Sequence, residues 1–198
     1  LVRVRRGAYA GGSQASDLDH HRRLIAATVP LIGADSVVSH ASAAVMHGLP
    51  VPSDRLEKVW ATRPGGGNGR KGPVLHLRRC RLEPDEIVVV DGIAVTSLLR
   101  TATDLARLLG MEWAVIAADA SLRLGAERAQ LLEAAERVRG WPGGARVMSA
   151  AQFADPLAES PLESVSRLQL HRLGYPAPTL QFEVRAAGRV VAVADFCW

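Results

Sequence analysis

The sequence predicts a mixed α/β (α+β) fold, and three observations support this prediction. In the first half, short segments alternate apolar and polar residues with a period of two, as strands do, and glycine-containing turns separate them. From Ser97 onward the apolar residues recur with a helical period, and three successive segments each end at a glycine. The last part returns to two strand-like segments around Ala187-Gly188. We therefore expect small β-hairpins and a helical core.

The N-terminal part begins with the alternating segment "LVRVRRGAYA", which predicts a short strand or hairpin that turns on Gly7. Residues 17–32 carry apolar side chains at helical spacing and predict one helix. The segment "SVVSHASAAVMHGLP" predicts a short strand, then a helix of small residues that begins near Ser39 and ends at Gly48.

Two strand pairs are expected next. The segments "KVWATR" and "PVLHLRR" alternate on either side of the glycine-rich loop "PGGGNGRKG", which predicts a β-hairpin. The segments "EIVVV" and "IAVTS" are joined by Asp91-Gly92, a strong signal for a two-residue hairpin turn.

Residues 98–110, 111–125 and 127–140 predict three consecutive helices that form the main apolar core. Their spacing predicts that five side chains are buried: Leu105, Leu108, Trp113, Ile116 and Leu131. Proline and small residues between Trp141 and Pro156 mark a domain boundary, after which a helix begins near Ser160.

Positive charge is concentrated in one stretch. The chain has 24 Lys or Arg and 20 Asp or Glu, a net formal charge of +4. Residues 55–81 alone carry +7, because the acid Glu57 accompanies eight cations: Arg55, Lys58, Arg63, Arg70, Lys71, Arg78, Arg79 and Arg81. Such side chains on a hairpin can contact DNA phosphates without reading sequence, while a merely solvated hairpin tip remains an equal alternative. The loop lacks the Gly-Lys-Ser/Thr ending of a nucleotide-binding P-loop.

The histidines and serines do not form a recognisable catalytic or metal-binding motif. His40 and His47 are seven residues apart, near two helical turns, but no cysteine or carboxylate completes a ligand set. Ser39 and Ser42 lack the Gly-x-Ser-x-Gly elbow of a hydrolase. Capping or surface positions are the expected roles of these residues.

Two acids carry a more specific signal. Asp195 lies among the apolar residues of "RVVAVADFCW", and a buried carboxylate needs a partner. Glu163 follows Ser160-Pro161-Leu162, which fits a capping box with proline at the first helical position. A helix acid beside a strand acid is also a common way to build a magnesium site.

Residues 159–198 resemble the start of the endonuclease domain of very-short-patch repair nucleases, in the PD-(D/E)xK superfamily. By this resemblance, Glu163 matches the helix acid, Gln181 the strand glutamine and Asp195 the first metal-binding aspartate of a Mg²⁺ site. The resemblance implies the first helix and β-hairpin of a restriction-endonuclease-like fold at residues 146–198. The next strand of that family, which carries the second carboxylate, is expected to lie beyond Trp198, so this chain by itself is expected to be inactive and to need no cofactor.

The segments "VRVRRGAYA", "VVSHASAAVMHGLP", "VTSLLRTATDLARLL" and "AADASLRLG" resemble actinobacterial proteins with an AbiEi-type antitoxin or transcriptional-regulator region. This resemblance implies that residues 1–10 are the remnant of a winged-helix wing and residues 11–145 the antitoxin-like region. It implies DNA as a partner, with Arg3, Arg5, Arg6, Arg63, Arg70, Lys71, Arg78 and Arg79 as candidate DNA-binding residues. A nucleotidyltransferase-like toxin is a second expected partner.

Three functional hypotheses follow from these features. The first is a DNA-associated regulator of the AbiEi antitoxin class with an incomplete nuclease-like C-terminus. The second is a metal-dependent endonuclease, complete only in a longer product or through a partner, and the third is a degraded reading frame without activity. No apolar run reaches the roughly 20 residues of a membrane span, and no signal peptide is recognisable, so we expect a cytoplasmic protein without a membrane partner.

Overall fold

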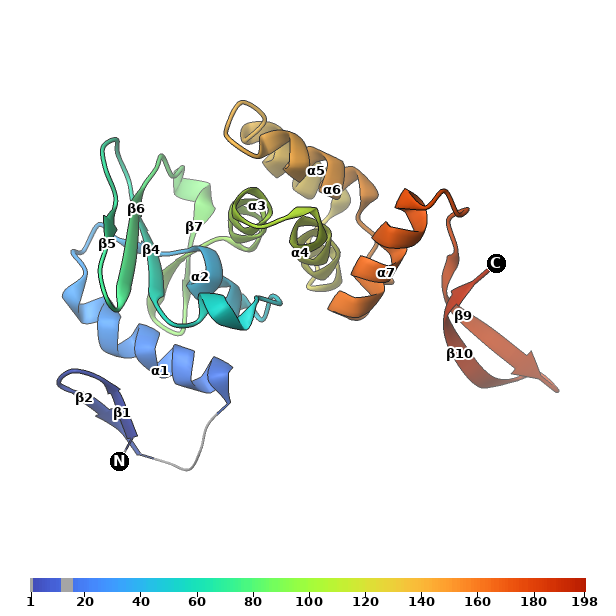
Figure 1. The fold of residues 1–198 in the computed structure, drawn as a ribbon, viewed down its shortest axis with the longest axis horizontal. Helices are drawn as coiled ribbons and strands as arrows, with labels where there is room; N and C mark the ends of the chain where they lie inside the picture. The colour runs from blue at the N-terminus through green and yellow to red at the C-terminus, as the bar shows by residue number, and fades with distance from the viewer. Residues whose placement is uncertain (1, 12–15) are drawn as a thin grey trace. The chain divides into compact units, whose positions relative to one another are not determined.

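The computed structural model describes residues 2–11 and 16–198, and for Val2, Arg3 and Ala10 it describes the backbone alone. These residues form seven α-helices and ten β-strands, which confirms the mixed α/β (α+β) prediction (Figure 1). The chain divides into two compact units, residues 1–104 and 105–198, and the boundary lies within helix α3 (Leu98–Leu108). The domain limits expected at residues 10 and 145 remain predictions.

The first unit is built around a six-stranded mixed sheet whose strands lie in the order β5-β6-β4-β3-β8-β7. Its strands are β3 (Val37–Val38), β4 (Val59–Arg63), β5 (Arg70–Lys71), β6 (Leu75–Arg79), β7 (Ile87–Val90) and β8 (Ile93–Thr96). The same unit contains a separate hairpin, β1 (Val2–Arg5) with β2 (Ala8–Ala10), and the helices α1 (Asp17–Thr28) and α2 (His40–His47).

Three turns in this unit form where the sequence predicts them. Gly7, at φ 78°, turns the β1–β2 hairpin, and Gly48, at φ 76°, ends α2 in the left-handed conformation. Asp91 and Gly92, both at positive φ, join the antiparallel strands β7 and β8.

The predicted hairpin between residues 58–63 and 73–79 is wrong. Strand β6 pairs with β4 in parallel, and the antiparallel neighbour of β6 is β5, which lies inside the expected loop. Residues 64–74 form a connection long enough to carry the chain back to the level of the start of β4, which a parallel pair of strands requires. This connection requires glycine at position 69, because a Cβ on Gly69 would lie 2.4 Å from the carbonyl oxygen of Leu77.

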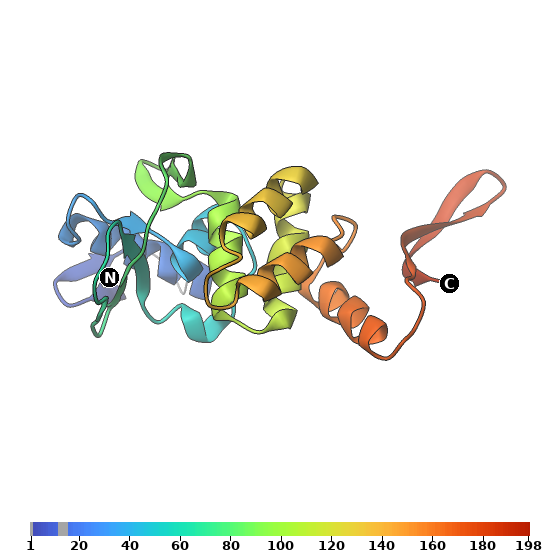
Figure 2. The same ribbon diagram turned by 90° about the horizontal axis from the view of Figure 1, so that it is seen from above.

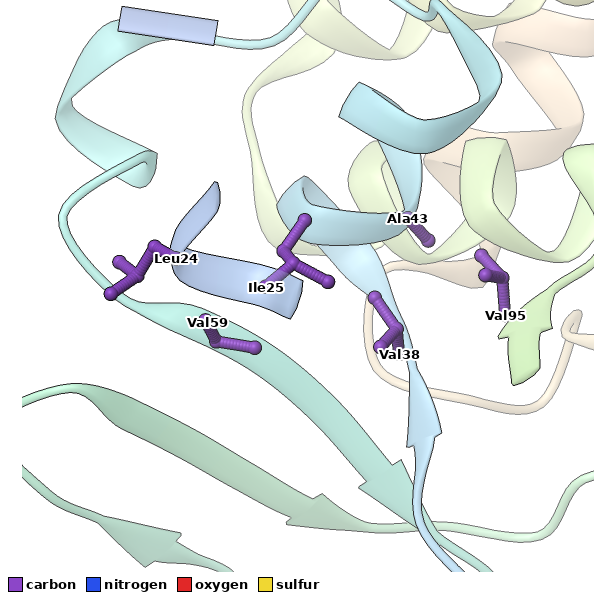
Figure 3. Packing of buried hydrophobic residues seen from close by; sticks show 6 residues of the cluster. All are labelled: Leu24, Ile25, Val38, Ala43, Val59 and Val95. Atoms are coloured by element: carbon purple, nitrogen blue, oxygen red, sulfur yellow. The ribbon is translucent and has the colours of Figure 1, made fainter. Parts of the chain in front are cut away.

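The hydrophobic core of the first unit joins one face of the sheet to α1 and α2. Val38, Val59 and Val95 come from three adjacent strands, and Leu24, Ile25 and Ala43 come from the two helices (Figure 3). All six side chains are buried, so this contact fixes the helices on the sheet.

A buried chain of hydrogen bonds links α1 and α2 to β4. The backbone N–H of Trp60 donates to Ser42 Oγ at 2.8 Å, and Ser42 Oγ lies 2.8 Å from His21 Nε2. His21 Nδ1 lies 2.6 Å from the carbonyl oxygen of Leu56 and therefore carries the proton, which leaves Nε2 to accept from Ser42. Burial lowers the pKa of His21, in keeping with this neutral form.

The second unit contains the remaining helices and a two-stranded sheet. The helices are α4 (Met111–Arg123), α5 (Arg128–Arg137), α6 (Gly144–Phe153) and α7 (Pro161–Arg172). The sheet is the antiparallel pair β9 (Thr179–Ala186) and β10 (Arg189–Cys197), which extends beyond α7 in both views (Figures 1 and 2). No helix of the described residues combines the length and the apolar character that a membrane span needs.

A buried ion pair connects α4, α6 and α7. Both Asp119 carboxylate oxygens accept hydrogen bonds from Arg167 Nη2 at 2.9 Å, and Asp119 also accepts from the backbone N–H of Asp155 at 2.7 Å. Arg167 donates further to the carbonyl oxygen of Phe153 and lies over its ring. These contacts satisfy a charge that would otherwise be costly to bury.

The burial expected for the helical segments is confirmed for Leu105, Ile116 and Leu131. Leu108 and Trp113 are half-buried instead. At the end of α3 the buried position is shifted by one residue from the expected one, because Leu109 is buried in place of its neighbour Leu108.

Replacing Leu105 should destabilise the fold strongly. Leu105 is 1% exposed, so Leu105→Ala should lower the free energy of unfolding by about 2 to 5 kcal/mol, measured by denaturant titration. Leu124→Ala is the matched control, because Leu124 is 47% exposed and its truncation should change stability by less than about 0.5 kcal/mol. Equal effects of the two substitutions would contradict this assignment of the core.

Candidate nucleic-acid interface

The basic stretch of residues 55–81 forms one edge of the six-stranded sheet. Strand β5 is the outermost strand and β6 is the next, as Figure 1 shows. Arg70, Lys71 and Arg79 are exposed, and Arg63 and Arg78 are half-buried. The sequence reasoning placed these five cations on a hairpin, whereas the structure places them along a sheet edge of three strands.

The strand pairing shows that the charge occupies both faces of this edge. Directly paired residues share a face, so Lys71 lies on the same face as His76 and Trp60. Arg70 pairs with Leu77 and therefore lies on the opposite face, which Arg79 shares. Positive side chains thus surround the edge.

Most of these cations have no carboxylate partner. Arg55 and Arg81 form ion pairs with Asp54 and Glu83. Within residues 2–11 and 16–198, no ion pair is formed by the other six cations of the stretch, which are Lys58, Arg63, Arg70, Lys71, Arg78 and Arg79. Arg63 donates to Ser36 Oγ, and Arg79 to the carbonyl oxygen of Gly66. A cluster of unneutralised cations on a sheet edge attracts a polyanion.

The candidate arginines of the N-terminal hairpin differ from one another. Arg5 Nε donates to the carbonyl oxygen of Ala27 in α1 at 3.0 Å, so this side chain ties the hairpin to the helix. Arg6 is exposed and is available to a partner. The side chain of Arg3 lies outside the described residues, and its candidate role stays a prediction.

Two of the three residues suggested by the nuclease resemblance meet in the structure. Gln181 Nε2 donates to Glu163 Oε2 at 3.2 Å. Half of the predicted capping box is present: the backbone N–H of Glu163 donates to Ser160 Oγ at 3.2 Å, whereas Glu163 Oε1 accepts from the Ser160 hydroxyl at 2.7 Å and not from the Ser160 backbone N–H. Oε2 accepts in addition from the backbone N–H of Glu159 at 2.9 Å. Both carboxylate oxygens are therefore engaged by the chain itself.

Asp195 does not lie in an apolar environment, so the premise that it needs a buried partner is wrong. It is exposed on β10, as are Val190, Val191 and Val193. Its strand neighbours Ala194 and Phe196 pair with Phe182 and Leu180, which flank Gln181. The apolar residues of β10 line an exposed hairpin, and the carboxylate of Asp195 is exposed with them.

The acids and histidines of the described residues do not assemble into a metal site. No group of three or more His, Cys, Asp or Glu side chains there could hold an ion. His21 uses both ring nitrogens within the core, and His47 Nε2 lies 2.7 Å from the carbonyl oxygen of Thr96. The residues present therefore do not fit a Mg²⁺ site by themselves.

Two mycobacterial proteins are similar to this chain along its whole length. No protein-family profile matches the sequence. "Uncharacterized protein Rv2248" and "Uncharacterized protein MT2308", from two strains of Mycobacterium tuberculosis, are each 30% identical to it over 199 residues. The match spans the whole chain and 70% of each relative. The chain belongs to the family of these mycobacterial proteins.

The capping role of Glu163 can be tested by two substitutions. Glu163→Ala should lower the free energy of unfolding by about 0.5 to 2 kcal/mol, because it removes the side chain that returns to the helix N-terminus. Glu163→Gln should lose less stability than Glu163→Ala in a denaturant titration, since the side-chain oxygen of glutamine can still accept one of these hydrogen bonds. Equal losses with Gln and with Ala would contradict the capping role, because they would show that only the negative charge matters at this position.

Proposed function

We propose that this chain is a DNA-associated regulator of the AbiEi antitoxin class with a nuclease-like C-terminal region. The observation that supports the proposal is the sheet edge of β4, β5 and β6, where five cations, together with Lys58 just before β4, have no carboxylate partner in the described part of the chain. The proposal includes a cytoplasmic location and a nucleotidyltransferase-like toxin as a second partner.

The chemistry of this edge favours the DNA backbone over base edges. Lysine and arginine side chains neutralise phosphates and release condensed counterions, which gives affinity without sequence information. No α-helix lies within the basic stretch between Arg55 and Arg81, so it lacks the element that most often enters the major groove. The expected contact is therefore made to phosphates and is sensitive to salt.

A metal-dependent endonuclease is the second candidate, and the contact between Gln181 and Glu163 is the observation that favours it. Against it, both oxygens of Glu163 accept hydrogen bonds from the chain, and Asp195 is exposed on a separate strand. We derive no hydrolytic step from this arrangement.

Duplex binding should be weak, sequence-independent and dependent on salt. With three or four phosphate contacts, the logarithm of the association constant should fall against the logarithm of salt concentration with a slope of about −3 to −4. Arg70→Glu/Arg79→Glu should reduce the magnitude of this slope by about 2 in fluorescence anisotropy titrations.

The matched control for that titration is Arg139→Glu/Arg185→Glu, which makes the same charge change on exposed arginines of the second unit. The control should leave the slope unchanged. Equal weakening by both double variants, or binding that does not depend on salt, would refute a specific role of the sheet edge.

The chain should not cleave DNA in the presence of Mg²⁺ or Mn²⁺. Asp195→Ala should leave the near-zero nicking rate of supercoiled plasmid unchanged, because Glu163 is engaged in the helix cap and Asp195 lacks a second carboxylate. Highly purified parent protein and the variant should be compared side by side. Metal-dependent nicking by the parent that Asp195→Ala abolishes would favour the endonuclease over the regulator.

A further inference from the structure

A hollow of about 250 Å³ lies in the first unit, beside the basic sheet edge. Residues of the turn η2 (Ser53–Arg55), the segment before β4, and the strands β4, β5 and β6 line it. Its walls combine three cations, two carboxylates and two aromatic rings. Each of these three kinds of group limits what the hollow can bind.

The three cations are Arg55, Lys58 and Lys71. Lys58 and Lys71 form no ion pair within the described residues. Arg55 Nε is buried and makes no hydrogen bond there; Asp54 Oδ2 lies 3.4 Å away, but not in hydrogen-bonding geometry. An anionic group in the hollow would therefore meet three cations, two of which have no carboxylate partner in the described residues.

The two rings are those of Trp60 and His76, whose centroids lie 4.1 Å apart. The ring of Trp60 also stacks on His40, with centroids 5.4 Å apart. Trp60 is buried, whereas the imidazole of His76 is partly exposed. This imidazole offers a ligand a flat surface on a fixed support.

His76 is neutral at pH 7 in the absence of a ligand. Burial first, and then the charges of Lys71, Arg78, Lys58 and Arg55, lower its pKa to about 4. Four cations therefore surround an imidazole that stays neutral, and its flat face can stack on an aromatic base.

The carboxylates of Asp54 and Glu57 distinguish this hollow from a simple phosphate site. Both are exposed, and they would repel a bare anion at their side of the hollow. Carboxylates accept hydrogen bonds from hydroxyl and amino groups, as acidic residues do with ribose in dinucleotide sites. A ligand with a phosphate at one end and such donors at the other satisfies all three kinds of group.

We propose that this hollow binds a nucleoside monophosphate, with its phosphate among Arg55, Lys58 and Lys71 and its base on the ring of His76. The volume of about 250 Å³ lies near the lower end of the range of small-ligand pockets, and is closer to what one nucleotide needs than to what a dinucleotide needs. The nucleotide is either free or the 5′-phosphorylated end of a strand. This binding goes beyond the proposed duplex contact, which involves phosphates along the outer edge.

The test measures binding of the four ribonucleoside 5′-monophosphates by isothermal titration calorimetry to the full chain. Inorganic phosphate and adenosine are the partial ligands, and a single-stranded oligonucleotide with or without a 5′-phosphate represents the strand end. At least one monophosphate or the phosphorylated oligonucleotide should bind saturably and more tightly than inorganic phosphate. His76→Ala and Lys71→Gln should each weaken it by about tenfold or more.

Arg79→Gln is the control, because Arg79 lies on the opposite face of the same strand as His76. Arg79→Gln should weaken duplex binding and leave nucleotide affinity unchanged. The two measurements therefore show separately whether the duplex contact or the nucleotide site is wrong. Thermal melts verify that the variants are folded. Lys71 is exposed, so Lys71→Gln should not disturb the packing of the core.

A second readout is the pKa of His76, followed by NMR titration of its imidazole. Bound phosphate should raise this pKa from about 4, because it neutralises the surrounding cations. Preferential binding to the monophosphates, or to the 5′-phosphorylated strand alone, supports the proposal. Binding of inorganic phosphate as tight as that of every nucleotide, insensitivity to His76→Ala, or no binding at all would overturn it.

Discussion

The parallel pairing of β6 with β4 is the constraint on which the functional surface depends. It places Leu75 beside Val59 and His76 beside Trp60, and it leaves β5 as the outermost strand. Without this pairing, Lys71 would not share a face with Trp60, and the hollow beside His76 would lose one wall. The glycine-rich crossover makes the pairing possible, because a side chain at Gly69 would collide with the backbone of β6.

The same arrangement concentrates like charges that the fold does not neutralise. Elsewhere in the first unit a buried cation is fully paired: Arg100 donates to Asp104 at 3.0 Å and to Glu86 at 2.6 Å. Burial opposes the charge of Arg100, but these carboxylates outweigh it and raise its pKa. The cations of β5 and β6 lack such partners in the described residues. Self-repulsion at this edge reduces stability, and a bound polyanion would relieve it.

The sequence predicted local structure well because local rules decide it. Asp91-Gly92 requires positive φ at both positions, Gly48 ends a helix, and the Ser160 side chain caps the N–H of Glu163 at the start of α7; each depends on residues a few positions apart. The direction of strand pairing depends on residues far apart in the chain, so alternation alone could not distinguish a hairpin from a parallel crossover. Apolar alternation also suggested that Asp195 is buried, whereas no further layer of the described residues covers β10.

The candidate binding residues were predictable only in part. The concentration of positive charge in residues 55–81 can be read from the sequence. Arg70 and Lys71 belong to this stretch, and the structure places them on the edge strand β5. The hollow was missed because Trp60 and His76 are 16 positions apart and become neighbours only through the parallel register. Since the chain is 30% identical to relatives that have no functional name, the sheet edge itself carries the functional argument.

The most direct test of the account is to map where DNA contacts the chain. Amide chemical-shift changes of ¹⁵N-labelled protein should be recorded on addition of a short duplex at low and at moderate salt. The account predicts that the changes are concentrated in β5, β6 and the residues 64–69 that precede them, and that they diminish as salt screens the phosphates. Changes concentrated in β9 and β10, or spread evenly over both units, would contradict the claim that the edge beside β4 is the nucleic-acid interface.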